Sequence, residues 1–198
     1  MTRRAPALTR SLLLGLWLCL PLSFFFHIAP GETQSLWSED EQRLRLGLKI
    51  FPACLGALES LEERLTSSGS LLVLVVHRDS EASAREAAAS FTTMAEIRGH
   101  PIKTRVITAS ALDGYDGVAP GGIFIASLGL EPSRLRAWSE RHRTLVFSPF
   151  AGAVEDGAVA GIYVADRILP FVNQAQARRA GIRFKPFFLD VARRYEGD

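Results

Sequence analysis

Cysteine is scarce in this chain of 198 residues, which contains only Cys19 and Cys54. Cys19 falls within an apolar run near the N-terminus, and without that run Cys54 has no partner for a disulfide within the chain. A lone thiol in an oxidising compartment either joins two chains or is buried as a small apolar side chain. We expect burial, because Phe51, Leu55 and Leu58 lie close to Cys54 in the sequence.

Motifs that carry chemistry are also missing. The first predicted strand runs into His77, Arg78 and Asp79 without a glycine, which excludes a P-loop or a dinucleotide-binding loop there. The four histidines lack metal-ligand spacing, and neither Ser127 nor Ser148 lies in a Gly-x-Ser-x-Gly elbow. We therefore expect no catalytic residue, no metal site and no cofactor, in a protein that is not an enzyme.

Acidic residues are absent from the first 31 positions, where Arg3, Arg4 and Arg10 precede a mostly apolar run over 12–26. A basic start followed by a short apolar segment is typical of a secretory signal, although the length of this run is near the border with a membrane span. Residues 1–31 are expected to be a signal peptide or an inner-membrane anchor. Either one places the working part of the protein in the periplasm.

An excess of charge of either sign is lacking once this leader is set aside. The rest of the chain carries 20 lysines and arginines against 21 aspartates and glutamates. The basic pI of the whole chain, about 8.7, therefore comes from the leader and gives no support for nucleic-acid binding. Residues 32–198 are enough for one domain with a self-sufficient core.

Hydrophobic periodicity predicts alternating helices and strands after the leader. Apolar residues recur at helical spacing over 38–65, from a capping box at Ser38, and Pro52 is expected to break this segment into two helices near Phe51. The predicted strands are 71–76, 103–108, 123–127, 145–148 and 158–164. The other predicted helices are 80–97, 132–142, the segment from Asn173 to 179, and 186–195, and residues 110–122 are expected to be a loop.

This alternating order predicts an α/β fold. Each crossover between parallel strands needs a covering helix, so we expect a three-layer α/β/α domain with a mostly parallel sheet. We expect one domain over residues 38–198, preceded by the signal or anchor helix.

Two surfaces are candidates for function. Phe184, Phe187 and Phe188 lie among arginines near the C-terminus, and we predict an apolar partner surface there. His77 and Ser127 each end a predicted buried strand, and ligands of open α/β sheets gather at the carboxyl ends of the strands. These two residues mark a ligand-binding edge in an alternative interpretation.

The C-terminal third has a pattern that points to a family. A glycine-bearing strand, an isoleucine-to-asparagine segment and an Ala-Gly-Ile joint precede a last apolar helix, at residues 158–164, 167–173, 180–184 and 188–192. This pattern resembles the YfiR-like periplasmic proteins. The upstream segments 51–52, 123–127 and 145–148 fall in the order of that family too, so the resemblance covers most of residues 44–195.

The resemblance implies a periplasmic regulator that binds and restrains a membrane-bound diguanylate cyclase, and so controls cyclic-di-GMP signalling and biofilm formation. The best-known members carry disulfides, which Cys54 alone does not allow. We expect a non-enzymatic interaction protein whose partner is a membrane protein, such as a diguanylate cyclase with a periplasmic sensor region. Whether the chain also forms a homodimer is left open. The alternative is a periplasmic small-ligand-binding protein related to a transport solute receptor.

Overall fold

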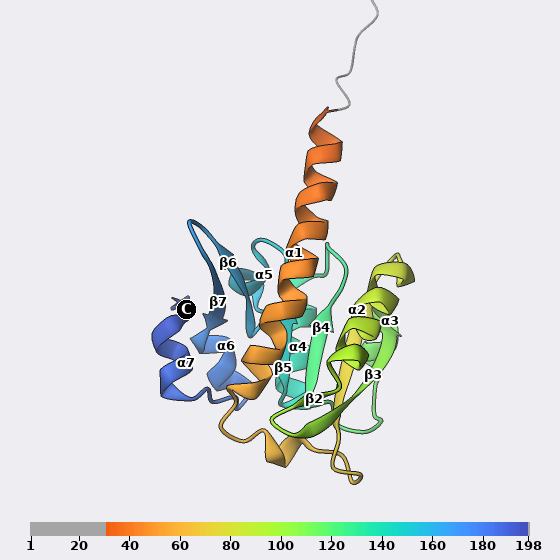
Figure 1. Cartoon of the computed structure of the whole chain (residues 1–198), viewed down its shortest axis with the longest axis vertical. Coiled ribbons are helices and arrows are strands. Elements are labelled where there is room, and N and C mark those ends of the chain that lie inside the picture. The colour runs from red at the N-terminus through yellow and green to blue at the C-terminus, as the bar shows by residue number, and fades with distance from the viewer. Residues whose placement is uncertain (1–30, 198) are drawn as a thin grey trace, which may run out of the picture.

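The computed structural model describes residues 31–197, so the predicted leader lies outside the described residues except for Gly31. The described chain has the predicted α/β architecture, with helices on both faces of an eight-stranded, mostly parallel sheet (Figure 1). Within these residues, no helix combines the length and the apolar character that crossing a membrane requires.

The sheet has the strand order β2-β3-β1-β4-β5-β6-β7-β8. The strands are β1 (Leu71–His77), β2 (Glu96–Ile97), β3 (His100–Thr108), β4 (Gly122–Ile125), β5 (Leu145–Ser148), β6 (Ala160–Val164), β7 (Ile168–Asn173) and β8 (Arg193–Tyr195). Neighbours pair in parallel except β2 with β3 and β6 with β7. Because the chain passes from β1 to β3 on one side and then crosses to β4 on the other, the topological switch point lies between β1 and β4.

Helices cover the sheet in two layers. They are α1 (Gly31–Gly56), the short 3-10 helix η1 (Glu62–Arg64), α2 (Glu81–Met94), α3 (Ala109–Asp113), α4 (Pro132–His142), α5 (Ala153–Asp156), α6 (Gln174–Arg179) and α7 (Pro186–Val191). Val73 and Val75 of β1 belong to the core cluster with α1 and α2, whereas Leu74 and Val76 belong to the cluster with α3 and α4. This alternation is the two-residue period of a strand buried on both faces.

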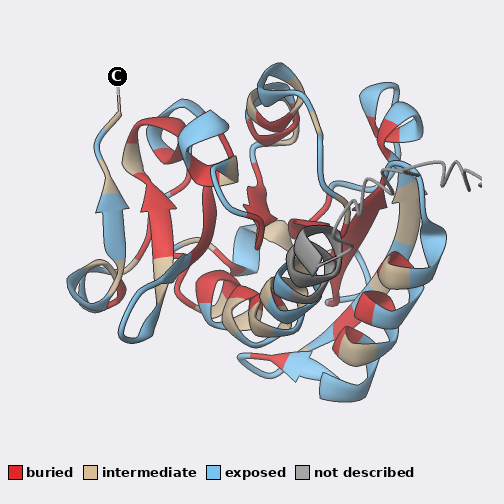
Figure 2. Cartoon of the chain, turned by 90° about the horizontal axis from the view of Figure 1, so that it is seen from above, coloured by how far each residue is buried: buried red, intermediate tan, exposed pale blue. Residues whose placement is uncertain are grey.

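Four buried phenylalanines form the centre of the core between α1, α2 and the sheet. They are Phe51, Phe91, Phe124 and Phe147, and the contacting pairs have ring centroids 5.1 to 5.7 Å apart. Cys54 is fully buried in the same cluster, which confirms its predicted role as a small apolar residue. Figure 2 shows the burial concentrated in the strands and on the sides of the helices that face them.

The prediction of two helices meeting near Phe51 was wrong, because α1 continues through Pro52. Proline removes one backbone hydrogen bond and crowds the carbonyl four residues earlier. The face carrying Phe51 and Leu55 is nevertheless fully buried against the sheet on both sides of the proline, and this packing keeps the helix continuous. The helix also begins at Gly31, earlier than the predicted start at Ser38, and it ends at Gly56, so the predicted helical segment up to residue 65 is too long.

The predicted helix over 80–97 was also too long, because α2 ends at Met94 and β2 follows. Arg98 and Gly99 form the two-residue connection between the antiparallel strands β2 and β3, with φ of 53° and 80°. Two positive φ values in such a turn match the twist of the flanking strands. Gly99 therefore acts as a hairpin residue, and its interpretation as a helix stop was mistaken.

Most of the other predicted elements are confirmed. The helix at 132–142 and the strand at 145–148 have the predicted ends, and Asn173 caps α6 by accepting a hydrogen bond from the backbone N–H of Gln176 at 2.8 Å. Other differences remain. Residues 110–113 of the predicted loop belong to α3, helix α5 and strand β7 were not predicted, and β3 begins at His100 instead of residue 103. The predicted helix over 186–195 ends at Val191 because residues 193–195 pair with β7.

Candidate functional site

His77, the last residue of β1, and Ser127, which follows β4, lie near each other at the switch point of the sheet, as expected from the ends of the two predicted strands. The Ser127 hydroxyl oxygen accepts a hydrogen bond from the backbone N–H of Arg78 at 3.2 Å. His77 is 8% exposed, and its Nδ1 atom has no hydrogen-bond partner within the described residues. The carboxyl edge thus contains a buried polar group at the place where the alternative interpretation puts a ligand.

The side chain of Arg78 joins the two loops at this edge. Its Nη1 donates to the carbonyl oxygen of Gly129 at 2.6 Å, and its Nε donates to Asp79 at 2.7 Å. Gly129 has φ of 71°, and a Cβ there would lie 2.7 Å from Arg78 Nη1. The cavity beside Ser127 and Ser148 measures about 100 Å³. Sites for small molecules usually have about 300–1,000 Å³, so this edge offers little space for a ligand.

The three phenylalanines of the predicted partner surface do not share one environment. Phe184 and Phe188 are buried and stack on each other with ring centroids 5.3 Å apart. Phe187 is 65% exposed on α7, one helical turn before Val191, which is also exposed. Of the predicted residues, Phe187 alone presents its ring to the surface, and the other two belong to the core.

A second exposed apolar area lies at the tip of the β6–β7 hairpin, near the part of α1 that rises above the carboxyl edge of the sheet (Figure 1). Val164 and Ile168 are register partners at the tip of the β6–β7 hairpin, and both are exposed. They line a groove of about 290 Å³ together with Leu46 of α1. We call the groove and its rim the α1–hairpin groove; it is formed by residues 39, 42, 43, 46 and 164–168.

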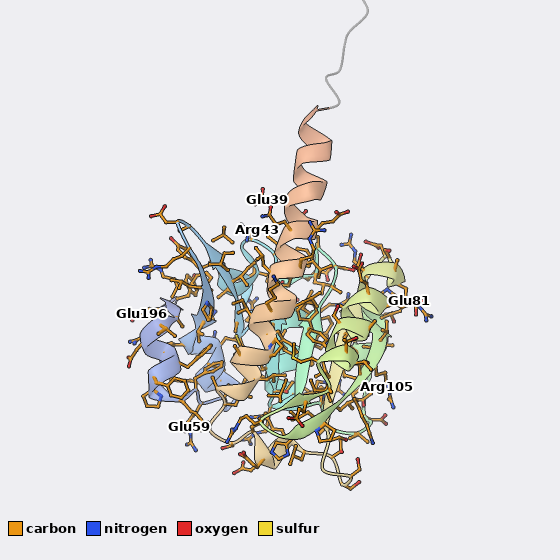
Figure 3. The ribbon with its side chains drawn as sticks, viewed as in Figure 1. Glu39, Arg43, Glu59, Glu81, Arg105 and Glu196 are labelled. Atoms are coloured by element: carbon orange, nitrogen blue, oxygen red, sulfur yellow. The ribbon has the colours of Figure 1, made fainter. Side chains whose placement is uncertain are left out.

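Charged side chains of both signs surround this apolar strip. Glu39 and Arg43, which Figure 3 shows on the rising part of α1, form an ion pair at 3.1 Å. Asp166 and Arg167 of the hairpin turn lie on the other side. An apolar centre with a polar rim is the usual anatomy of a surface that binds another protein.

Part of the signal for the α1–hairpin groove was present in the sequence. The predicted strand over 158–164 places Ile162 and Val164 on one face by its two-residue period, and Ile162 is indeed buried under α1. The groove was nevertheless missed, because the strand β7 that carries Ile168 was not predicted. Without β7 the sequence predicted no hairpin, so nothing indicated that Ile168 lies beside Val164.

Burial shifts the pKa of Cys54 and that of His142, which lie in different parts of the domain. Burial raises the pKa of the Cys54 thiol, which keeps it protonated and unreactive. The pKa of His142, in the last turn of α4, is lowered first by burial and then by the positive charge of Arg141. Its ring packs edge-on against Tyr115, with centroids 5.9 Å apart. No group of three His, Cys, Asp or Glu side chains in residues 31–197 is placed to hold a metal ion.

The pKa of His142 predicts a loss of stability in mild acid. Because its folded pKa lies below that of the unfolded chain, its contribution is complete above the ordinary value of about 6.5 and is lost as the pH falls from there toward the folded pKa. Urea unfolding of the wild type and of His142→Gln, at about pH 7.5 and about pH 5, measures this. We expect the wild type to lose more stability than the variant, and equal losses would contradict the assignment.

Comparisons with known proteins show similarity of fold only. No family model matches the sequence, and no curated protein matches it. Similar solved structures include an ABC domain in complex with L-Trp from Streptococcus pneumonia, with 12% identity, a TM-score of 0.48, and coverage of 71% of this chain and 61% of that one. A ligand-free, open substrate-binding protein with adhesive properties from Clostridium difficile has 16% identity, a TM-score of 0.47, and coverage of 65% and 55%.

A conserved domain protein from Vibrio cholerae O1 biovar eltor has 15% identity, a TM-score of 0.43, and coverage of 68% of this chain and 60% of that one. The chain therefore spans between 55% and 61% of the length of these three structures. No ligand or partner of this chain follows from such a likeness. The resemblance to the YfiR-like proteins is not tested by these comparisons and stays a prediction.

Proposed function

We propose that this protein is a non-enzymatic periplasmic regulator that acts by binding a membrane protein, and that the α1–hairpin groove is its contact surface. One observation carries the proposal. Val164 and Ile168 are 45% and 39% exposed side by side, at the end of the domain from which α1 leads back toward the leader. Apolar side chains that are adjacent and exposed are typical of an interaction site.

The direction of the chain supports a partner in the membrane. The predicted leader precedes α1, so an uncleaved anchor would hold the α1–hairpin groove on the side of the domain that faces the bilayer. The mixed charges of Glu39, Arg43, Asp166 and Arg167 suit a protein surface better than an anionic lipid surface, which attracts clustered basic residues. A periplasmic segment of a membrane protein fits both features.

The resemblance to the YfiR-like family supplies the first partner to test, a membrane-bound diguanylate cyclase with a periplasmic sensor region. The small-ligand alternative at His77 and Ser127 has less structural support, because Arg78 joins the two loops there and the adjacent cavity is small. Regulation of cyclic-di-GMP signalling and of biofilm formation is the expected consequence of the binding.

Crosslinking in membranes tests the proposal. The full chain is expressed in its natural host, crosslinked, and purified together with whatever membrane protein it contacts. We expect Val164→Ser with Ile168→Ser to reduce the crosslinked product, because an apolar contact is lost while both side chains are already exposed enough for the fold to tolerate the change. The matched control is Phe187→Ser with Val191→Ser, a change of equal character on α7.

The outcomes separate the two surfaces. Loss of the crosslink in the hairpin variant alone supports the α1–hairpin groove. Loss in the α7 variant alone would move the partner surface to Phe187 and overturn our assignment of the groove. If the wild type yields no membrane partner, or yields only a second copy of itself, the proposed function is wrong.

A further inference from the structure

A cavity rich in arginine lies at the amino edge of the sheet, away from the α1–hairpin groove. It measures about 620 Å³ and is lined in part by Arg64 of η1, His142 and Arg143 at the end of α4, and Arg178 in the last turn of α6. Elements distant in sequence therefore contribute to one concave surface, because α4 and α6 both end at this edge. Its size falls within the range of sites that bind small molecules.

Positive charge in this cavity exceeds the negative charge of its lining. Arg183, which also lines it, pairs with Glu59 at 2.9 Å. In residues 31–197, no carboxylate lies within 4.0 Å of Arg64, Arg143 or Arg178, whereas Arg78, Arg98, Arg134 and Arg179 on other surfaces each have such a partner. The lining includes one acidic residue, Glu63.

Two buried polar atoms of the cavity also lack partners in the described part of the chain. They are Nε of Arg64 and Nε2 of His142. The Arg64 guanidinium reaches the carbonyl oxygen of Arg143 through Nη1, which fixes its position but leaves Nε without an acceptor. A buried N–H without an acceptor has a cost of about 1–3 kcal/mol, so the chain holds the Arg64 side chain beside the cavity in an arrangement that its own contacts do not fully stabilise.

Geometry holds the guanidinium groups in place. Arg143 has a left-handed backbone, with φ of 48°, at the end of α4. Its guanidinium packs over Gly181, where a Cβ would lie 3.0 Å from Nη2. Burial lowers the pKa of Arg64, the nearby Glu63 carboxylate acts in the opposite direction, and the positive charge of Arg143 lowers it, as expected for two cations held close together.

The ends of α4 and α6 account for part of this charge, because the carbonyl end of a helix favours a cation. Arg178 satisfies that rule in the last turn of α6. The rule accounts for one contact of Arg64, whose Nη1 donates to the carbonyl oxygen of Arg143 at the end of α4, but it leaves the buried Nε without an acceptor. The gathering of three guanidinium groups without carboxylate partners needs a further explanation.

We propose that this cavity binds a small phosphate-bearing anion, whose phosphate oxygens accept hydrogen bonds from Arg64, Arg143 and Arg178. The planar guanidinium fork matches a phosphate in paired hydrogen bonds, and three cations suit a group of charge near −2. Leu58 and Ile182 line the same cavity and provide an apolar wall for an organic substituent of the ligand. The site is independent of the proposed partner surface.

Isothermal titration calorimetry of the full chain with inorganic phosphate, inorganic pyrophosphate and glycerol 3-phosphate tests the proposal, at constant ionic strength set with chloride. We expect saturable binding of at least one of them with a dissociation constant below about 1 mM. Arg143→Gln and Arg178→Gln should each weaken it about tenfold or more, because each removes a charged hydrogen bond. Arg85→Gln is the matched control, since Arg85 pairs with Glu81 on the distant surface of α2.

A second measurement needs no variant. In the ¹⁵N-labelled wild type, the same titration should shift the ring resonances of His142, with its unpartnered Nε2, and leave those of His77 unchanged. Absence of saturation, equal weakening by Arg85→Gln, or an unshifted His142 would each overturn the proposal. Binding to phosphatidylglycerol vesicles without binding to any soluble phosphate would overturn it as well, since the site would then recognise a lipid surface.

Discussion

Replacing Phe124 by alanine is expected to lower the free energy of unfolding by about 3–5 kcal/mol. The ring is fully buried on β4, and it contacts Phe51, Phe91 and Phe147 with centroids 5.1 to 5.7 Å apart. These neighbours come from α1, α2 and β5, so the cavity left by the substitution is bounded by three elements that cannot all close on it. Urea unfolding followed by circular dichroism measures the loss.

Phe187→Ala is the matched control for this substitution. It removes the same ring from α7, where the side chain is 65% exposed, and we expect a change within about 0.5 kcal/mol. Comparable losses for the two variants would mean that the phenylalanine cluster is not the centre of the core.

Gly161→Ala on β6 should be the second most disruptive change, with a loss of about 3 kcal/mol, at the upper end for overpacked sites. A Cβ at this position would overlap the carbonyl oxygen of Ser148 on the neighbouring strand and lie 2.7 Å from Cγ2 of Val154. The main-chain oxygen of Ser148 is held by the sheet and cannot rotate away, so β6 itself must move. Thermal and urea unfolding would both report the effect.

Gly114→Ala provides the control for the added methyl group. Gly114 has φ of −101°, and a Cβ at this position would meet no atom within 4 Å. Because alanine also restricts the unfolded chain, this variant should be as stable as the wild type or slightly more stable. A similar loss in both variants would show that the close approach of β5 and β6 is not the cause.

The sequence was sufficient for the architecture because the buried parallel strands have a strong signal. Val73, Val75 and their neighbours form an uninterrupted apolar run, and such runs were assigned correctly at β1, β4 and β5. The errors fall where tertiary packing decides the outcome. Pro52 stays within α1 because the helix face around it is buried, and the propensity of the residue led to the opposite prediction.

Surfaces were harder to predict than elements. Phe184, Phe187 and Phe188 look alike in the sequence, but their exposure depends on how α7 packs, and the structure buries the first and the last. The arginine cavity had no local pattern at all, because Arg64, Arg143 and Arg178 lie far apart in the chain and meet only where α4, α6 and η1 end. Long-range convergence of this kind requires the fold.

The two outermost strands of the sheet are unusually brief: β2 spans two residues and β8 spans three. At the β8 border few free backbone donors and acceptors are therefore offered to a foreign strand, whereas β2 pairs only with His100 and Pro101 and leaves the outer edge of β3 beyond Ile102 without a strand partner in the described residues. A homodimer built by joining two sheets into one continuous ribbon is disfavoured at the β8 border for this reason, and at the other border it would have to pair two copies of β3. Self-association elsewhere would have to rely on side chains presented by the helices or by the tip of the β6–β7 hairpin.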